Sequence, residues 1–215
     1  MIAATAAAHP LLRDAAALLV DLDGTLVDST APVVRAWTAF AHRHGLDPEH
    51  VLRSAQGRPS RETAASFTPP ELHAREAAAI EHAEVHDTDG VVALPGAAAL
   101  LRSATPLAIV TSCSTALARA RLRASGLPVP DVLVSCDDVA RGKPDPEPFL
   151  LGARRLGVDV ERCVVLEDAP AGIAAGRAAG ARVIAVRTGH AAAELAAASP
   201  HAIVDDLRAL GLDAR

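Results

Sequence analysis

Short apolar runs alternate with alanine-rich amphipathic stretches along most of the chain. The apolar runs are continuous, which is typical of strands whose two faces are both buried in a sheet. Glycines follow several amphipathic stretches, at positions where helices are expected to end. This alternation predicts an α/β fold, with a mostly parallel sheet flanked by helices. The expected strands are Ala16–Leu22, Leu107–Thr111, Val132–Ser135, Cys163–Glu167 and Val183–Val186, and the expected helices are Pro95–Ser103, Thr115–Ser125, Glu147–Leu156 and Ala171–Ala179.

One long segment, residues 29–94, breaks this alternation because it holds helical patterns and no convincing strand. A helical insertion after the first strand is the simplest explanation, with hinges near Asp28 and Leu94. We therefore expect an α/β core formed by residues 1–28 and 95–215, and an α-helical cap formed by the insertion. The helices expected in the cap are Ala31–His44, Asp47–Leu52, Ser60–Phe67 and Glu71–His86.

The composition argues against several classes of protein. Half of the 215 residues are hydrophobic and 22% are charged, so the chain has enough apolar residues to bury a core. The net charge of −5 favours no nucleic-acid partner, and no apolar run approaches the roughly 20 residues that span a bilayer. The alanine-rich start, Met1–His9, lacks the basic region of a signal peptide and is interpreted as a frayed tail. We expect a cytoplasmic protein with three reduced cysteines, and a monomer by default.

Two of the expected strands lead into pairs of acidic residues. Asp21 and Asp23 stand in the segment Asp-Leu-Asp-Gly-Thr, and Glu167 and Asp168 follow the apolar run that begins at Cys163. Ligands bind at the carboxyl ends of the strands in an open α/β sheet, so these carboxylates are expected to share one site. Crowded carboxylates repel one another unless a hard cation such as Mg²⁺ balances their charge. Either pair alone could instead form a turn or cap a helix.

A hydroxyl pair and a lone lysine add groups that suit a phosphate. Thr111 and Ser112 follow the apolar run that begins at Leu107, where hydroxyl and backbone N–H groups can bind a phosphate oxygen or cap the next helix. Lys143 is the only lysine among the 21 Lys and Arg residues, and it stands in the segment Gly-Lys-Pro-Asp-Pro. Its compact ammonium suits a narrow position between a carboxylate and a phosphate better than the planar fork of arginine does. A surface lysine retained by chance is the alternative.

These four segments, in this order and each at the end of a strand, resemble the haloacid dehalogenase-like (HAD) superfamily of phosphotransferases. The resemblance covers about Ala16 to Asp206, including the insertion, which is similar to the small α-helical cap of that family. It implies a Rossmann-like core, bound Mg²⁺ and a reaction through an aspartyl-phosphate. It further implies that Asp21 is the nucleophile and that Asp23 is the general acid for the leaving group and then the general base for water.

The resemblance also assigns roles to the supporting residues. It implies that Thr111 and the backbone at Ser112 bind the transferring phosphoryl group. It implies that Lys143 neutralises charge between the nucleophile and the phosphate. The implied metal ligands are Asp21, Asp23 through its carbonyl group, Asp168 and, in support, Glu167.

Departures from the family pattern narrow the expected activity. Asp23 argues against cleavage of a carbon–halogen bond, because dehalogenases of the family lack an acid at this position. Phosphonatases and β-phosphoglucomutases of the family use a lysine in the cap, and this chain has no lysine other than Lys143. Val33 stands where those mutases have a histidine. The segments Ala93–Ala97 and Glu167–Gly172 resemble the sugar or hexitol phosphatase branch. We expect a Mg²⁺-dependent hydrolase of a small sugar or sugar-alcohol phosphate. The runner-up is a glycerol-3-phosphate or phosphoglycolate-type phosphatase, ahead of a mutase or a non-catalytic phosphometabolite sensor.

The cap is expected to read the leaving group. The segment Gly57–Arg61 lies between two cap helices, where a loop would close over the site and exclude water. Arg58 and Arg61 are therefore candidates for contacts with substrate hydroxyls or the phosphate, with an ordinary surface position as the alternative. Trp37 and Phe40 are helically spaced and are interpreted as packing residues rather than as sugar-stacking residues.

Overall fold

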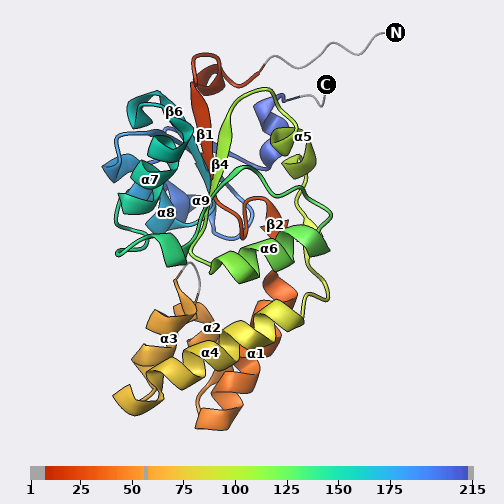
Figure 1. Ribbon diagram of the computed structural model, residues 1–215, viewed down its shortest axis with the longest axis vertical. Helices are drawn as coiled ribbons and strands as arrows, with labels where there is room; N and C mark the ends of the chain where they lie inside the picture. Colours follow the sequence, from red (N-terminus) through yellow and green to blue (C-terminus); the bar gives the residue numbers. More distant parts are fainter. Residues whose placement is uncertain (1–7, 56–57, 213–215) are drawn as a thin grey trace.

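The computed structural model describes residues 8–55 and 58–212, and within them it contains a six-stranded parallel sheet (Figure 1). The strand order is β5-β4-β1-β6-β7-β8, so β1 lies between β4 and β6. The strands that carry the acidic and hydroxyl segments are therefore direct neighbours, and the predicted α/β class is confirmed. The strands are β1 (Ala17–Val20), β4 (Leu107–Val110), β5 (Val132–Val134), β6 (Cys163–Glu167), β7 (Arg182–Val186) and β8 (Ala202–Val204).

Helices cover both faces of this sheet, as Figure 1 shows. Both faces of β1 are buried, because Leu18 and Val20 pack into one apolar cluster while Ala17 and Leu19 pack into another. Leu122 of α6 belongs to the first cluster. This two-sided burial is the reason for the continuous apolar run in the sequence. The core helices are α5 (Ala97–Leu101), α6 (Thr115–Ala124), α7 (Glu147–Leu156), α8 (Pro170–Ala178) and α9 (Ala192–Ala197), with short 3-10 turns at Pro10–Leu12, Cys136–Asp138, Val160–Arg162 and Leu207–Leu210.

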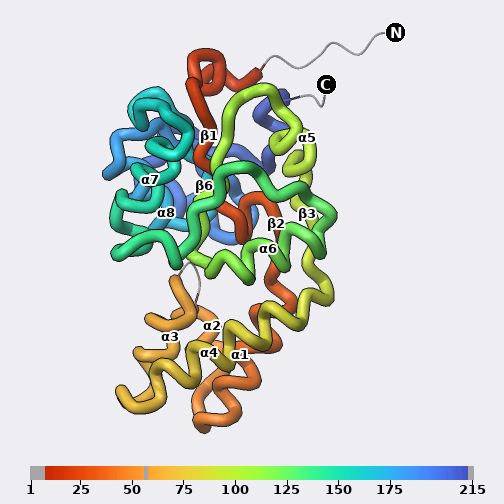
Figure 2. Tube along the Cα trace, in the orientation of Figure 1, coloured from red at the N-terminus to blue at the C-terminus, as the bar shows by residue number. Residues whose placement is uncertain are grey.

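The helices within residues 30–86 form a bundle beside the core (Figure 2), and this bundle has its own apolar core. Trp37 and Phe40 are buried in this core together with Val51 and Ile80. The rings of Trp37 and Phe40 meet edge to face, with centroids 5.4 Å apart, which is the packing role expected of them. The helices are α1 (Thr30–His44), α2 (Pro48–Ala55), α3 (Ser60–Phe67) and α4 (His73–His86), with a 3-10 turn at Pro70–Leu72.

The two connections between the core and this bundle pair with each other. β2 (Val27–Asp28) and β3 (Val92–Ala93) form a two-stranded antiparallel sheet. The expectation of no strand within residues 29–94 was therefore wrong, because a two-residue strand is too short to show a period in the sequence. The pairing of β2 with β3 brings the two predicted hinges side by side. The boundaries of the core and cap domains stay a prediction.

Two expectations fall on residues outside the described ranges. The first seven residues of the expected tail lie outside the described residues, and so does Gly57 of the expected cap loop. Across the part of the chain that is described, no helix is both long and apolar enough to cross a bilayer.

Candidate active site

The carboxyl ends of β1, β4 and β6 line a pocket of about 630 Å³ between the sheet and the cap. Asp21 directly follows β1, Thr111 directly follows β4, and Asp168 directly follows β6. The first two turns of α1 and the inner face of α4 complete the wall on the cap side. The predicted site residues that line this pocket are Asp21, Asp23, Arg58, Arg61, Thr111, Ser112, Lys143, Glu167 and Asp168.

Lys143 occupies the centre of the carboxylate cluster. Its Nζ donates hydrogen bonds to Asp21 Oδ1 at 2.5 Å, to Glu167 Oε1 at 2.8 Å and to the backbone carbonyl of Val110 at 2.9 Å. Only 4% of the Lys143 side chain is exposed. Burial lowers the pKa of Lys143, but the charges of Asp21 and Glu167 outweigh it and raise the pKa overall. Lys143 is therefore a permanently charged cation against the predicted nucleophile.

Asp21, Glu167 and Asp168 bring more carboxyl groups to the site than the single charge of Lys143 can balance. Burial raises the pKa of Asp21 to about 8; Glu167 and Asp23 add to this shift and Lys143 opposes it. Burial also raises the pKa of Asp168 well above its usual range, and the neighbouring Glu167 and Asp21 add to it. Both groups would ionise readily beside a divalent cation.

The donor set of this cluster fits Mg²⁺ rather than a closed metal cage. Within the described residues, no three His, Cys, Asp or Glu side chains converge as a ready-made metal site. Mg²⁺ typically keeps several waters and binds proteins through one or two carboxylates, so Asp21 and Asp168 would be enough as acidic ligands. Glu167 is engaged elsewhere, because its Oε2 accepts a hydrogen bond from the Ala169 backbone at 2.8 Å and its Oε1 accepts one from Lys143.

Glycines give these carboxylates the room that they need. A Cβ on Gly24 would lie 2.1 Å from Asp168 Oδ2, and the φ of +81° at this residue disfavours any other side chain. A Cβ on Gly172, in the first turn of α8, would lie 1.7 Å from Glu167 Oε1. In the segments Asp-Gly-Thr and Ala-Pro-Ala-Gly, glycine therefore stands where a carboxylate lies directly against the backbone.

The hydroxyl pair lies beside the carboxylates. Thr111 is 4% exposed, and its Oγ1 accepts a hydrogen bond from the backbone N–H of Cys113 at 3.1 Å. Ser112 lines the same pocket as Thr111. Ser114 caps α6, because its Oγ accepts a hydrogen bond from the Leu117 N–H. The helix cap is therefore supplied by Ser114, and Thr111 and Ser112 are left to face the pocket.

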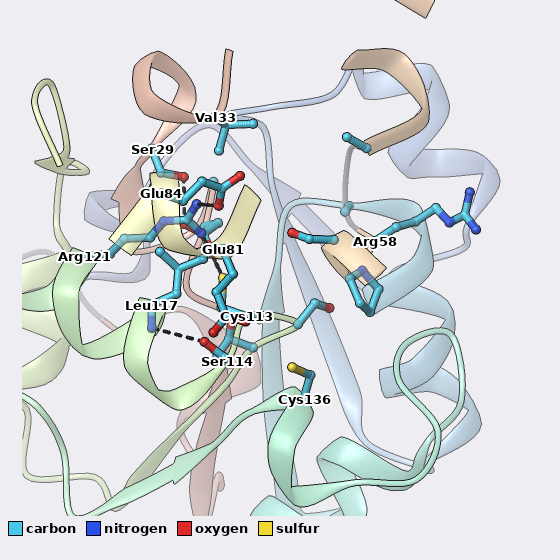
Figure 3. A pocket seen from close by; sticks show the side chains of 18 of the residues that line it. Ser29, Val33, Arg58, Glu81, Glu84, Cys113, Ser114, Leu117, Arg121 and Cys136 are labelled. Carbon is cyan, nitrogen blue, oxygen red and sulfur yellow. Dashed lines mark hydrogen bonds and ion pairs between the residues drawn. The ribbon is translucent and has the colours of Figure 1, made fainter. Parts of the chain in front are cut away.

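Sequence reasoning missed the partners of Asp23. The Asp23 carboxylate accepts hydrogen bonds from Ser29 Oγ at 2.7 Å, Arg121 Nη1 at 2.6 Å and Cys113 Sγ at 2.9 Å. Arg121 also donates from Nη2 to Glu84 Oε2 at 2.7 Å, and Figure 3 shows these two side chains meeting near Ser29 (Figure 3). In the sequence Arg121 is one of several arginines in a helix, and nothing local marks it as buried.

The two cap arginines are placed differently from Arg121. Arg58 and Arg61 are exposed and line the pocket, and Figure 3 shows Arg58 on the side of the pocket opposite Arg121. Arg58 makes a loose ion pair with Glu62 at 4.0 Å. Both arginines are therefore accessible to a bound ligand, and their role in substrate binding stays a prediction.

The fold and the carboxylate-lysine cluster together define a class of enzyme, the phosphatases that share a Rossmann-like core and a helical cap. The family model of the haloacid dehalogenase-like hydrolases matches residues 15–180, and the chain belongs to this family. It is 50% identical over 175 residues to hexitol phosphatase A of Escherichia coli, covering 78% of this chain and 81% of the relative.

Two further relatives extend this comparison. Validoxylamine A 7'-phosphate phosphatase of Streptomyces hygroscopicus is 38% identical over 190 residues, covering 84% of this chain and 89% of the relative. The crystal structure of CbbY from Rhodobacter sphaeroides in complex with phosphate superposes with a TM-score of 0.78 at 28% identity, covering 92% of this chain and 99% of that chain. The chain is an enzyme of the phosphatase class, as the sequence predicted.

Proposed function

We propose that this chain is a Mg²⁺-dependent hydrolase that removes the phosphoryl group from a small sugar or sugar-alcohol phosphate. The observation that carries the proposal is the buried contact between Asp21 and Lys143, at the sheet edge where Asp168 also lies. A carboxylate that is held against a permanent cation is prepared to approach a phosphate dianion. The similarity to hexitol phosphatase A supports the class of substrate.

In the proposed reaction, a carboxylate oxygen of Asp21 attacks phosphorus while the bond from phosphorus to the alcohol oxygen breaks. Lys143 reduces the repulsion between the carboxylate and the phosphoryl oxygens. Asp23 gives its proton to the leaving alkoxide and then takes a proton from the water that attacks the aspartyl-phosphate. Inorganic phosphate is released and the Asp21 carboxylate is restored. Thr111 and the backbone at Ser112 would bind the phosphoryl oxygens during both steps.

Mg²⁺ supplies further neutralisation of the phosphoryl charge when it is bound. The residues that would hold it are Asp21, Asp168 and the backbone carbonyl of Asp23. Glu167 would support the metal indirectly, since its Oε1 fixes Lys143 and its Oε2 is bonded to the backbone. Gly24 would keep the Asp168 carboxylate free to turn toward the metal, because any side chain there would meet it.

The pocket wall beyond the phosphate site favours a leaving group with hydroxyls and without a carboxylate. Glu81 of α4 lines this wall and points into the pocket in Figure 3. A carboxylate there would accept hydrogen bonds from hydroxyls and would repel a second carboxylate, such as that of phosphoglycolate. Arg58 and Arg61 would contact the hydroxyls from the cap. A cytoplasmic location and a monomeric state stay predictions.

Phosphate release from a panel of hexose, hexitol and triose phosphates and phosphoglycolate, with Mg²⁺ present, tests the proposal. Asp21→Asn serves as the control because it keeps the shape of the side chain and removes the nucleophilic charge. We expect turnover of sugar or sugar-alcohol phosphates that is abolished in the variant. Preferred turnover of phosphoglycolate would refute the substrate class, and equal turnover by Asp21→Asn would refute the role of Asp21.

A further inference from the structure

Arg121 is a buried cation that joins the core to the cap. It lies on α6 of the core, its side chain is 4% exposed, and it ion-pairs with Asp23 of the core and with Glu84 of the cap. Each of its two terminal nitrogens serves one carboxylate, at 2.6 Å and 2.7 Å. A guanidinium that bridges two carboxylates fixes both of them in place more firmly than a single ion pair does.

The contacts of Asp23 come from three different elements. Arg121 and Cys113 share Asp23 Oδ2, while Ser29 donates to Oδ1. Ser29 stands at the N-cap position of α1 but makes no capping hydrogen bond with its side chain; its hydroxyl binds Asp23 instead. The rotation of the Asp23 carboxylate is therefore set by donors and not by solvent, although 26% of this side chain is exposed toward the pocket.

The contact between Arg121 and Glu84, on the cap side, is more deeply buried than the contact between Arg121 and Asp23. Glu84 lies in the last turn and a half of α4, its side chain is 4% exposed, and α4 packs directly against α6. Burial raises the pKa of Glu84, while Arg121 opposes that shift. A displacement of α4 would separate Glu84 from Arg121 and leave a buried charge without its partner. The position of the cap helix and the position of Arg121 are therefore coupled.

We propose that Arg121 is a positioning residue that aims the Asp23 carboxylate, and that Glu84 transmits the position of the cap to Asp23 through it. The inference rests on the proposed function, because it takes Asp23 as the group that protonates the leaving oxygen. Ser29, at the entry to the cap, donates a hydrogen bond to this carboxylate, and Glu84, near the exit of the cap, is linked to it through Arg121. Proton donation would thus depend on how α4 lies over the substrate.

A comparison of two leaving groups distinguishes a positioning role of Arg121 from a merely structural one. An alkoxide leaves with a proton from Asp23, whereas a nitrophenolate leaves without one. The value of kcat/KM reports the steps up to the release of the alcohol, so its ratio between a sugar-alcohol phosphate and nitrophenyl phosphate measures the delivery of this proton. Partial unfolding would lower both values equally and leave the ratio unchanged.

The test measures this ratio in Arg121→Lys and Glu84→Gln, with Asp23→Asn as the reference. We expect Arg121→Lys to lower kcat/KM for the sugar-alcohol phosphate about 10- to 100-fold, and for nitrophenyl phosphate by less than about threefold. Glu84→Gln is expected to lower the ratio in the same direction and by a smaller factor. If Arg121→Lys does not fold, the ratio in Glu84→Gln decides the question alone.

Glu76→Gln is the matched control. Glu76 also lies on α4, its side chain is 7% exposed, and it pairs with Arg43 at 2.9 Å without contact to Asp23. In Glu76→Gln, the ratio of kcat/KM between the sugar-alcohol phosphate and nitrophenyl phosphate is expected to equal that of the wild type. A ratio that is unchanged in Arg121→Lys and Glu84→Gln, or that falls equally in Glu76→Gln, would overturn the inference. An unchanged ratio in Asp23→Asn would instead overturn the acid role of Asp23 and the inference with it.

Discussion

Replacement of Lys143 with methionine removes the one cation that, among the described residues, contacts the predicted nucleophile. At an effective dielectric constant of about 20, the attraction of Lys143 is about 7 kcal/mol to Asp21 at 2.5 Å and about 6 kcal/mol to Glu167 at 2.8 Å. Loss of solvation for three buried charges offsets much of this attraction. Removing one partner of a buried ion pair costs about 3 to 5 kcal/mol. We expect Lys143→Met to lower the free energy of unfolding by an amount in that range above pH 8, where Asp21, with a pKa of about 8, is ionised.

The loss of catalysis is expected to exceed what this loss of stability explains. A preorganised charge of this kind contributes about 3 to 4 kcal/mol to transition-state stabilisation, so kcat should fall about 10²- to 10³-fold in protein that is still folded. Phosphate release at saturating Mg²⁺, together with a urea unfolding curve, separates the two effects.

Lys143→Arg is the informative second variant because it retains the charge. The pocket holds the ammonium within reach of three acceptors, Asp21, Glu167 and the Val110 carbonyl, and a planar guanidinium does not fit the same position. We expect Lys143→Arg to lose at least about 10-fold in kcat because of this misfit. Wild-type kcat in Lys143→Arg would refute the argument from shape, and wild-type kcat in Lys143→Met would refute the argument from charge.

Three further predictions concern the metal, the close contact at Gly172 and the leaving group. Mg²⁺ at about 100 times its Kd is expected to stabilise the protein by about 2.7 kcal/mol, seen as a higher Tm. Asp168→Asn should abolish most of that rise, and an undiminished rise would contradict the assignment of Asp168. Gly172→Ala should lower both Tm and kcat, because the new Cβ would lie 1.7 Å from Glu167 Oε1. We expect this steric clash to outweigh the gain of about 1 kcal/mol in helix propensity. A higher Tm would show that Glu167 moves aside freely. Glu81→Gln should increase kcat/KM for phosphoglycolate relative to a hexitol phosphate, because it removes a like charge, and an unchanged ratio would place the leaving group elsewhere.

The sheet end of the site could be predicted because local sequence carries it. Asp21, Thr111 and Asp168 each follow a continuous apolar run, and a parallel sheet gathers the ends of such runs at one edge. Lys143 was marked by composition alone, as the only lysine in the chain. The structure brings these residues into one pocket.

The cap end of the site could not be predicted, because it depends on tertiary contacts. Arg121 stands between Arg119 and Arg123 and has the pattern of a surface residue. Its burial comes from contacts with α4 and with Asp23, which are distant in sequence. Glu84 is hidden in the same way on an alanine-rich helix. The strand Val92–Ala93 was missed because its pairing partner is distant in sequence and each strand has two residues.

A covalent phosphoryl group on Asp21 can be detected by trapping it during turnover. The enzyme is mixed with Mg²⁺ and its best substrate, quenched with acid during turnover and digested, and the peptides are analysed by mass spectrometry, with borohydride reduction to convert an aspartyl-phosphate to homoserine. We expect a phosphoryl group, and homoserine after reduction, at Asp21 and not at Asp23. Phosphate release without a labelled peptide at any quench time, or a label on another residue, would show that Asp21 is not the nucleophile.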